Sequence, residues 1–324
     1  MKAIVVEQPG RPEVLQLKEI PTPDPRPGWV LIKIKAFGLN RSEMYSRQGH
    51  SGDAVTFPRV LGIECVGEVK DAGGSELHLG QKVAALMGGM GRKYDGSYAE
   101  YTLVPQSQVI PVDTTLSWEQ FSAIPETFMT AWGSLVKSIE LQERQTLLVR
   151  GGTSSVGMAA TTIAKNIGAT VVATTRNEAK SEALLANGAD HVIIDIGQIA
   201  GDVRELYPDG VDHVLELVGT VTLRDSFYTV KPKGVICFTG ILGNEWVLRE
   251  FSPFEIPSTV KLTTYSSETI GKDATEALQR IVGLAEAGQY RLNLDRVFRM
   301  EEIIEAHHFM DSGHACGKLV VIVD

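Results

Sequence analysis

The chain has 324 residues, of which 43% are hydrophobic and 22% charged, and its 31 basic against 40 acidic side chains give a net charge of −9. At roughly 100–200 residues per domain this length indicates two domains, and the composition excludes wholesale disorder, collagen-like repeats and a coiled coil. The negative charge makes nucleic acid and anionic membranes poor general partners, so we expect neither.

Cysteine usage and the absence of apolar runs indicate a reducing compartment. The three cysteines, Cys65, Cys237 and Cys316, lie far apart and are odd in number, which argues against a disulfide framework. Residues 1–7 reach an acidic side chain without a long apolar run, so they predict a strand rather than a signal peptide. No apolar stretch approaches the ~18 residues that a membrane span needs. We therefore expect a cytoplasmic protein.

The first 120 residues predict short strands separated by turns. Alternating apolar and polar side chains, frequent glycines and a proline-rich turn between Pro21 and Pro27 are typical of half-buried strands in a barrel-like domain. The expected strands are residues 2–7, 30–36, 60–69, 82–86 and 97–104.

The pattern changes near residue 118. Residues 118–136 predict two helical pieces around Pro125, and mostly apolar strands then alternate with helices, as in a doubly wound parallel sheet. The expected strands are 146–150, 170–174, 191–194, 211–216 and 234–239. The expected helices are 156–167, 177–186, 197–207 and 222–230.

The end of the chain is similar in character to its beginning. It predicts helices at 274–287 and 301–311 and a last strand at 318–323. We therefore predict an α/β fold in which a Rossmann-type parallel sheet, residues 123–267, is inserted into a mostly-β domain formed by residues 1–122 and 268–324.

A glycine-rich turn is the strongest local signal. It follows the strand 146–150 and opens a helix, where free N–H groups and the helix dipole favour a pyrophosphate. Gly152 and Gly157 stand at the first and third positions of G-x-G-x-x-G, and Ser154 at the middle one. The alternative is a plain strand-to-helix turn. We predict a dinucleotide held by Gly152, Thr153, Ser154, Ser155, Val156 and Gly157.

The end of the next strand indicates which dinucleotide binds. NAD sites carry an acidic residue about 20 residues after the glycine loop, where it binds the ribose 2′-hydroxyl. Thr175 stands there, Arg176 follows, and Lys180 lies one helical turn further on. Cations and hydroxyls bind a 2′-phosphate, which a carboxylate would repel. We predict NADP(H), bound here by Thr174, Thr175, Arg176 and Lys180; the alternative is that both cations are solvated residues at a helix start.

An ordered set of segments resembles the medium-chain dehydrogenase/reductase superfamily over essentially the whole chain, and within it the zinc-free quinone oxidoreductase branch. Each segment is weak alone, but their order and spacing are specific. They are residues 38–43, 61–67, 96–101, 123–132, the glycine loop, 187–190 and 317–320. The resemblance implies a GroES-like domain around the Rossmann sheet, with the nicotinamide at the base of a cleft between the two.

The resemblance also implies where a metal would bind. The positions that bind catalytic zinc in the superfamily's alcohol dehydrogenases hold Asn40, Ile63 and Glu126 here. Ile63 has no donor atom, and residues 85–110 contain none of the cysteines of a structural zinc lobe. We therefore predict no metal, and hydride chemistry carried by the cofactor.

Further cofactor contacts follow from the resemblance alone. Thr130 and Lys318 correspond to residues near the cofactor, and the strand end at Phe238, Gly240 and Ile241 corresponds to a segment that binds the nicotinamide carboxamide.

Three residues correspond to the substrate side. Asn40 supplies an amide that could orient the acceptor, Ser42 occupies the position of a proton-relay hydroxyl, and the phenol of Tyr45 could stabilise an oxyanion. A purely structural role in a turn or in packing is the alternative for each.

These features predict an NADPH-dependent, zinc-independent oxidoreductase that transfers hydride to quinones or α,β-unsaturated carbonyls. Two alternatives stay open: an enoyl thioester reductase, and a non-catalytic NADPH-binding sensor or partner protein. Residues 260–266 alternate like an edge strand, which can pair across a two-fold axis, so we expect a homodimer.

Overall fold

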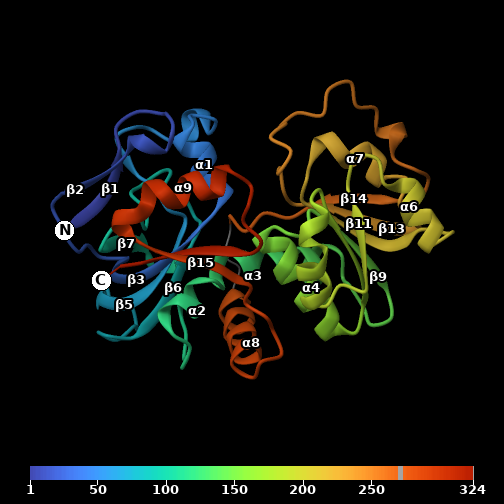
Figure 1. Cartoon of the computed structure of the whole chain (residues 1–324). Helices are drawn as coiled ribbons and strands as arrows, with labels where there is room; N and C mark the ends of the chain where they lie inside the picture. The colour runs from blue at the N-terminus through green and yellow to red at the C-terminus, as the bar shows by residue number, and fades with distance from the viewer. Residues whose placement is uncertain (269–272, 324) are drawn as a thin grey trace. The chain divides into compact units, whose positions relative to one another are not determined.

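The computed structural model describes residues 1–268 and 273–323. They form two compact units, coloured along the chain in Figure 1. The first, here the β unit, comprises Met1–Met129, Ser267–Gly288 and Leu294–Asp324. The second, here the α/β unit, comprises Thr130–Ser266 and Gln289–Asn293. The chain therefore leaves the β unit after Met129, builds most of the α/β unit and returns at Ser267; residues 289–293 then join the α/β unit in a second, short excursion.

The β unit contains two sheets. In the smaller one, β1 (Lys2–Val6) pairs antiparallel with β2 (Leu15–Glu19) and β4 (Arg59–Val60). The larger one runs in the order β15 (Leu294–Arg299), β16 (Lys318–Ile322), β3 (Trp29–Leu39), β5 (Glu64–Asp71), β6 (Lys82–Leu86) and β8 (Val109–Pro111), with β7 (Tyr101–Pro105) also paired to β3. β16, near the end of the chain, thus lies inside this sheet beside β3.

Helices of the β unit include one that the strand pattern did not predict. The expected helices are present as α2 (Trp118–Ser122), α8 (Ala274–Glu286) and α9 (Ile303–Asp311), with α3 (Pro125–Trp132) at the junction of the units. The additional helix, α1 (Arg41–Arg47), begins after Asn40, whose N–H donates to Glu43 Oε2 at 3.1 Å. This local bond satisfies the helix start, so a short polar sequence becomes helical.

The α/β unit is a fully parallel six-stranded sheet. Its order is β11 (His191–Ile194), β10 (Thr170–Thr175), β9 (Thr146–Arg150), β12 (Val211–Glu216), β13 (Val230–Phe238) and β14 (Lys261–Thr264). In sequence terms this is the 3-2-1-4-5-6 order of a Rossmann fold, with the reversal between β9 and β12. The predicted fold class is confirmed.

Helices cover both faces of this sheet (Figure 1). They are α4 (Ser155–Ile167), α5 (Ser181–Ala186), α6 (Ala200–Leu206) and α7 (Thr220–Ser226). One core gathers Leu148, Val172 and Val214 from the strands with Leu223 and Phe227, which belong to α7 and its C-cap. The strand ends are thereby fixed by apolar packing.

The predicted helix over residues 222–230 has the wrong bounds. Residues 222–230 were expected to be helical, but α7 spans Thr220–Ser226 and Val230 begins β13. Val230 pairs with Val211 and is buried, so the sheet rather than helix propensity decides its conformation. In the part of the chain that the structure describes, no helix has the length and apolar character to cross a bilayer.

Candidate dinucleotide-binding site

Three loops meet at the carboxyl edge of the α/β sheet. They follow β9, β12 and β13, the strands on either side of the reversal in strand order. Leu242 N–H donates to Leu217 O at 3.0 Å, and a Cβ added to Gly151 would lie 2.9 Å from Leu242 and 3.2 Å from Leu217. Ligands of open α/β folds bind at this switch point, outside the ends of the strands.

Glycine is favoured at three positions of the first loop, and most strongly at Gly151 and Gly157. Gly151 has φ 91°, which L side chains rarely adopt. A Cβ on Gly152 would lie 3.0 Å from the Thr174 carbonyl oxygen, and one on Gly157 would lie 2.5 Å from the Gly151 carbonyl oxygen. The start of α4 therefore packs against β10 and the loop without side chains between them.

Ser154, at the middle glycine position, needs no glycine geometry. It is the N-cap of α4 with φ −71°. Its Oγ accepts from Gly157 N at 3.1 Å and donates to Gly151 O at 2.8 Å, so its hydroxyl is used inside the loop. Thr153, Ser155 and Val156 remain partly exposed at the loop and the first turn. The open N–H groups of this 13-residue helix suit an anion such as a pyrophosphate.

The end of β10 separates the predicted 2′-phosphate residues into two kinds. Thr174 is buried and its Oγ1 accepts from Gly151 N at 3.0 Å, while the hydroxyl of Thr175 accepts from Asn177 N at 3.1 Å. Arg176 is exposed and has no hydrogen bond or ion pair with the described residues. Lys180 is partly exposed in the turn that precedes α5. The donor set therefore fits a dinucleotide with a 2′-phosphate: the threonines shape the edge, and Arg176 is exposed beside them.

The end of β13 joins the same edge. A Cβ on Gly240 would lie 2.5 Å from Leu217 O, so a glycine is needed where these two loops cross. Thr239 Oγ1 lies 2.9 Å from Ser134 Oγ, which donates to Thr130 O at 2.8 Å. The structure thus links Thr130 to the segment that contains Phe238, Gly240 and Ile241.

A buried ion pair lies beside Asn40 and Glu126, two of the positions that correspond to zinc ligands in the superfamily's alcohol dehydrogenases. Lys318 Nζ lies 2.5 Å from Glu64 Oε1 and 2.7 Å from Asn40 Oδ1, and the Lys318 and Glu64 side chains are 1% and 0% exposed. Asn40 Nδ2 donates to Glu64 Oε1 at 2.9 Å, and Glu126 N donates to Glu64 Oε2 at 2.8 Å. A buried ammonium therefore already neutralises the carboxylate of Glu64.

These residues do not fit a catalytic zinc. Ile63 offers only a backbone N–H, which donates to Glu43 Oε1 at 3.2 Å. Among the described residues, no group of three or more His, Cys, Asp or Glu side chains could hold a metal ion. Burial raises the pKa of Glu43 to about 7, so part of the negative charge near Asn40 is lost at neutral pH.

All three predicted substrate-side residues lie at α1. Asn40 precedes it, and Ser42 and Tyr45 lie on it. Ser42 Oγ accepts from Arg92 Nη2 at 2.6 Å, and Tyr45 is buried. Sequence reasoning missed Glu64 and Arg150, which form buried ion pairs. For Arg150 the available signal was a charged residue that ends an otherwise apolar strand.

Comparisons with known proteins agree with this architecture. Residues 26–114 match the alcohol dehydrogenase GroES-like domain and residues 187–321 match the zinc-binding dehydrogenase family. The chain is 26% identical to a quinone oxidoreductase of Pongo abelii over 333 residues, covering 100% of this chain and 98% of the relative. It is similar to the solved quinone oxidoreductase of Coxiella burnetii, with 27% identity, a TM-score of 0.86 and coverage of 100% and 99% of the two chains.

The Escherichia coli quinone oxidoreductase, solved in complex with NADPH, has a TM-score of 0.89 at 22% identity and covers both chains fully, which shows the shared fold. Family matches, relatives and fold agree over both units. The chain therefore belongs to the medium-chain dehydrogenase/reductase superfamily, as an oxidoreductase of its quinone oxidoreductase branch.

Proposed function

We propose that the protein is an NADPH-dependent, zinc-independent oxidoreductase that reduces quinones or α,β-unsaturated carbonyls. The observation that carries the proposal is the edge of the α/β sheet: a glycine loop opens α4, and the exposed Arg176 follows Thr175 where an NAD site would carry an acid. The NADPH bound to the Escherichia coli quinone oxidoreductase supports the same choice of cofactor.

The chain's own residues bind and orient the cofactor, which supplies the hydride. The backbone N–H groups of Thr153, Ser155 and Val156 face the pyrophosphate. Those of Gly152, Ser154 and Gly157 already donate to groups of the protein. Arg176 and Lys180 bind the 2′-phosphate through charge-assisted hydrogen bonds. Thr174 and Thr175 hold the backbone that presents these groups. Thr130 and the segment Phe238, Gly240 and Ile241 lie toward the nicotinamide.

The acceptor has to be electrophilic itself, because the residues at the zinc position do not fit a Lewis acid. We assign Asn40, Ser42 and Tyr45 to the surroundings of the acceptor. Lys318 holds the amide of Asn40 and Arg92 holds the hydroxyl of Ser42, so these groups are fixed before substrate arrives. Such preorganised dipoles stabilise developing charge better than mobile ones. In this proposal Lys318 acts through Asn40.

The test is NADPH consumption by the purified protein with an ortho-quinone, an enone, a trans-2-enoyl thioester and a saturated aldehyde, with NADH in parallel. We expect turnover with the quinone or the enone, a preference for NADPH, and no turnover with the aldehyde. Turnover of the thioester alone would replace the proposal by an enoyl thioester reductase. Tight NADPH binding without any turnover would replace it by a sensor.

We also propose a cytoplasmic homodimer. Three free cysteines fit a reducing compartment. In the described residues β14 pairs only with β13 and lies at the edge of the sheet, where a second copy could continue it. Light scattering on the purified protein would give twice the mass of the chain; a monomer at micromolar concentration would refute the dimer.

A further inference from the structure

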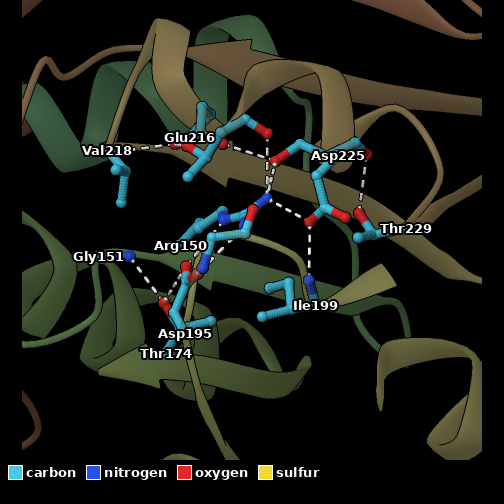
Figure 2. Close-up of polar contacts among 12 residues, drawn as sticks. Arg150, Gly151, Thr174, Asp195, Ile199, Glu216, Val218, Asp225 and Thr229 are labelled. Atoms are coloured by element: carbon cyan, nitrogen blue, oxygen red, sulfur yellow. Dashed lines mark hydrogen bonds and ion pairs between the residues drawn. The ribbon is translucent and has the colours of Figure 1, made fainter. Parts of the chain in front are cut away.

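A buried arginine lies directly beneath the glycine loop. Arg150 is the last residue of β9, and its side chain is 0% exposed. It stands in register with Glu216, the last residue of β12, so the two mark the switch point from either side. Figure 2 shows the Arg150 guanidinium between Asp195 on one side and Asp225 and Glu216 on the other.

The guanidinium binds two separate segments of the α/β unit, the turn that follows β11 and helix α7. Its Nε and Nη2 donate to the two oxygens of Asp195, just after β11, at 2.8 and 3.1 Å. Nη2 also donates to Gly197 O at 3.0 Å, and Nη1 donates to Asp225 Oδ2 of α7 at 2.8 Å. A planar group with five donors can satisfy so many partners only in one orientation.

One hydroxyl carries the same network to the second loop. Ser226 Oγ accepts from Arg150 Nη1 at 2.9 Å and donates to Glu216 Oε2 at 2.6 Å. Glu216 Oε1 in turn accepts from Val218 N at 2.8 Å and Gly219 N at 2.9 Å. The carboxylate of Glu216 therefore fixes the backbone of the loop after β12, and Arg150 fixes Glu216.

The network also reaches the glycine loop itself. Thr174 Oγ1 accepts from Gly151 N at 3.0 Å and lies 3.5 Å from Asp195 Oδ2 (Figure 2). Leu217 N donates to Arg150 O at 3.1 Å, which joins the two loops through their backbones. Hydrogen bonds thus connect the loops after β9 and β12 to the same side chain, that of Arg150.

Electrostatics indicates that the main contribution of Arg150 is to orient the loops rather than to raise the free energy of unfolding. Burial raises the pKa of Glu216, and the charge of Arg150 opposes that rise. Taking several charges out of water costs several kcal/mol each, and apolar side chains of similar size often stabilise a fold as well or better. What apolar side chains cannot supply is the set of directed bonds that holds both loops.

We propose that Arg150 is a positioning residue for NADPH, holding the loops after β9 and β12 in the shape that accepts the pyrophosphate. This inference rests on the proposed function, because it concerns the same cofactor site. Arg150 does not touch the cofactor in this proposal; it acts through Asp195, Thr174 and Glu216.

The test compares the Kd for NADPH, by direct titration, with the thermal midpoint for three variants. Arg150→Met removes the cation, and Ser226→Ala removes only the bridge to Glu216. Arg204→Met is the control, because Arg204 likewise donates several hydrogen bonds within the α/β unit, to the backbone carbonyls of Pro208, Tyr228 and Val230. Arg150→Met removes hydrogen bonds from a charged group that hold the loops, so we expect the Kd for NADPH to rise about tenfold. Ser226→Ala removes a neutral hydrogen bond, so we expect a rise of about threefold.

For Arg204→Met we expect a lower thermal midpoint and a Kd within twofold of the wild type. The inference is overturned if Arg150→Met and Ser226→Ala bind NADPH with the Kd of the wild type. It is also overturned if Arg204→Met lowers the thermal midpoint as much as Arg150→Met does and raises the Kd for NADPH by the same factor. Should Arg150→Met fail to fold, Ser226→Ala decides. A wild-type protein that does not bind NADPH refutes the proposed function instead, so the two failures are distinct.

Discussion

Removing the ammonium of Lys318 is expected to destabilise the β unit strongly. Lys318→Met leaves the carboxylate of Glu64, which is 0% exposed, without the cation 2.5 Å from its Oε1. Asn40 Nδ2 and Glu126 N still donate to this carboxylate, but neither carries a charge. Breaking a buried ion pair from one side costs about 3–5 kcal/mol, a large part of a typical total stability of about 5–15 kcal/mol.

A second substitution at Glu64 tests the cause of the loss, and an exposed ion pair of the same kind serves as the control. Glu64→Gln added to Lys318→Met removes the unpaired charge, so the double variant should regain stability over Lys318→Met alone. Lys18 pairs with Glu7 at 2.6 Å, but with side chains 36% and 52% exposed, so Lys18→Met should cost at most about 1 kcal/mol.

The assay is urea unfolding followed by hydrogen exchange of peptides from β5 and β16, which reports on the β unit separately from the α/β unit. A loss for Lys318→Met as small as that for Lys18→Met would refute the reasoning. So would a double variant less stable than Lys318→Met, because the cost would then not come from the unpaired carboxylate.

Three further predictions concern cofactor choice, the glycine loop and acid stability. Arg176→Asp should raise the KM for NADPH about tenfold or more and leave the KM for NADH unchanged. Arg144→Asp makes the same charge change at a side chain that is 91% exposed, and should leave both KM values unchanged. Equal effects of Arg176→Asp on NADPH and NADH would contradict the phosphate role. Gly157→Ala should cost about 1–3 kcal/mol and weaken NADPH binding, because its Cβ would lie 2.5 Å from Gly151 O; Gly201→Ala, with open space around its Cβ, should be neutral or stabilising in thermal unfolding. Burial and the charge of Arg47 lower the pKa of His307 to about 3, below its ordinary 6.5, so the unfolded chain takes up a proton that the folded one refuses. His307 should therefore contribute a loss of stability of about 1.4 kcal/mol per pH unit below 6.5, opposite in sign to the contribution of Glu43, whose pKa burial raises to about 7. Between pH 6.5 and 4.5 the stability-against-pH slope of His307→Gln should differ from that of the wild type by this amount; identical slopes would contradict the prediction.

The α/β unit was readily predicted from the sequence, because its strands are continuous apolar runs punctuated by glycines. β9, β11 and β12 have the predicted bounds. The glycine positions were predictable for the same reason, since Gly152 and Gly157 are needed by backbone packing that recurs in this fold. Local pattern and tertiary structure agree in this unit.

The ion-pair networks could not be predicted in the same way. Lys318 and Glu64 are 254 positions apart in the chain, and no local periodicity relates them. Arg150 and Glu216 are each the last residue of a strand, where a charged side chain predicts the start of a solvated loop. The folded structure instead pairs the two residues in register and buries both. Helix α1 was missed because its start is stabilised by contacts with Glu43 rather than by an apolar face.

The position of β16 inside the larger sheet has a consequence for synthesis on the ribosome. β16 pairs with residues Ala36 to Leu39 of β3, all of them buried in the finished protein. The α/β unit is nearly contiguous and emerges between the two strands, so it can fold first, while this part of β3 keeps an unpaired apolar edge. The nascent chain therefore exposes this apolar edge until β16 has been synthesised, and a chaperone that binds extended apolar segments would meet its target near residue 37.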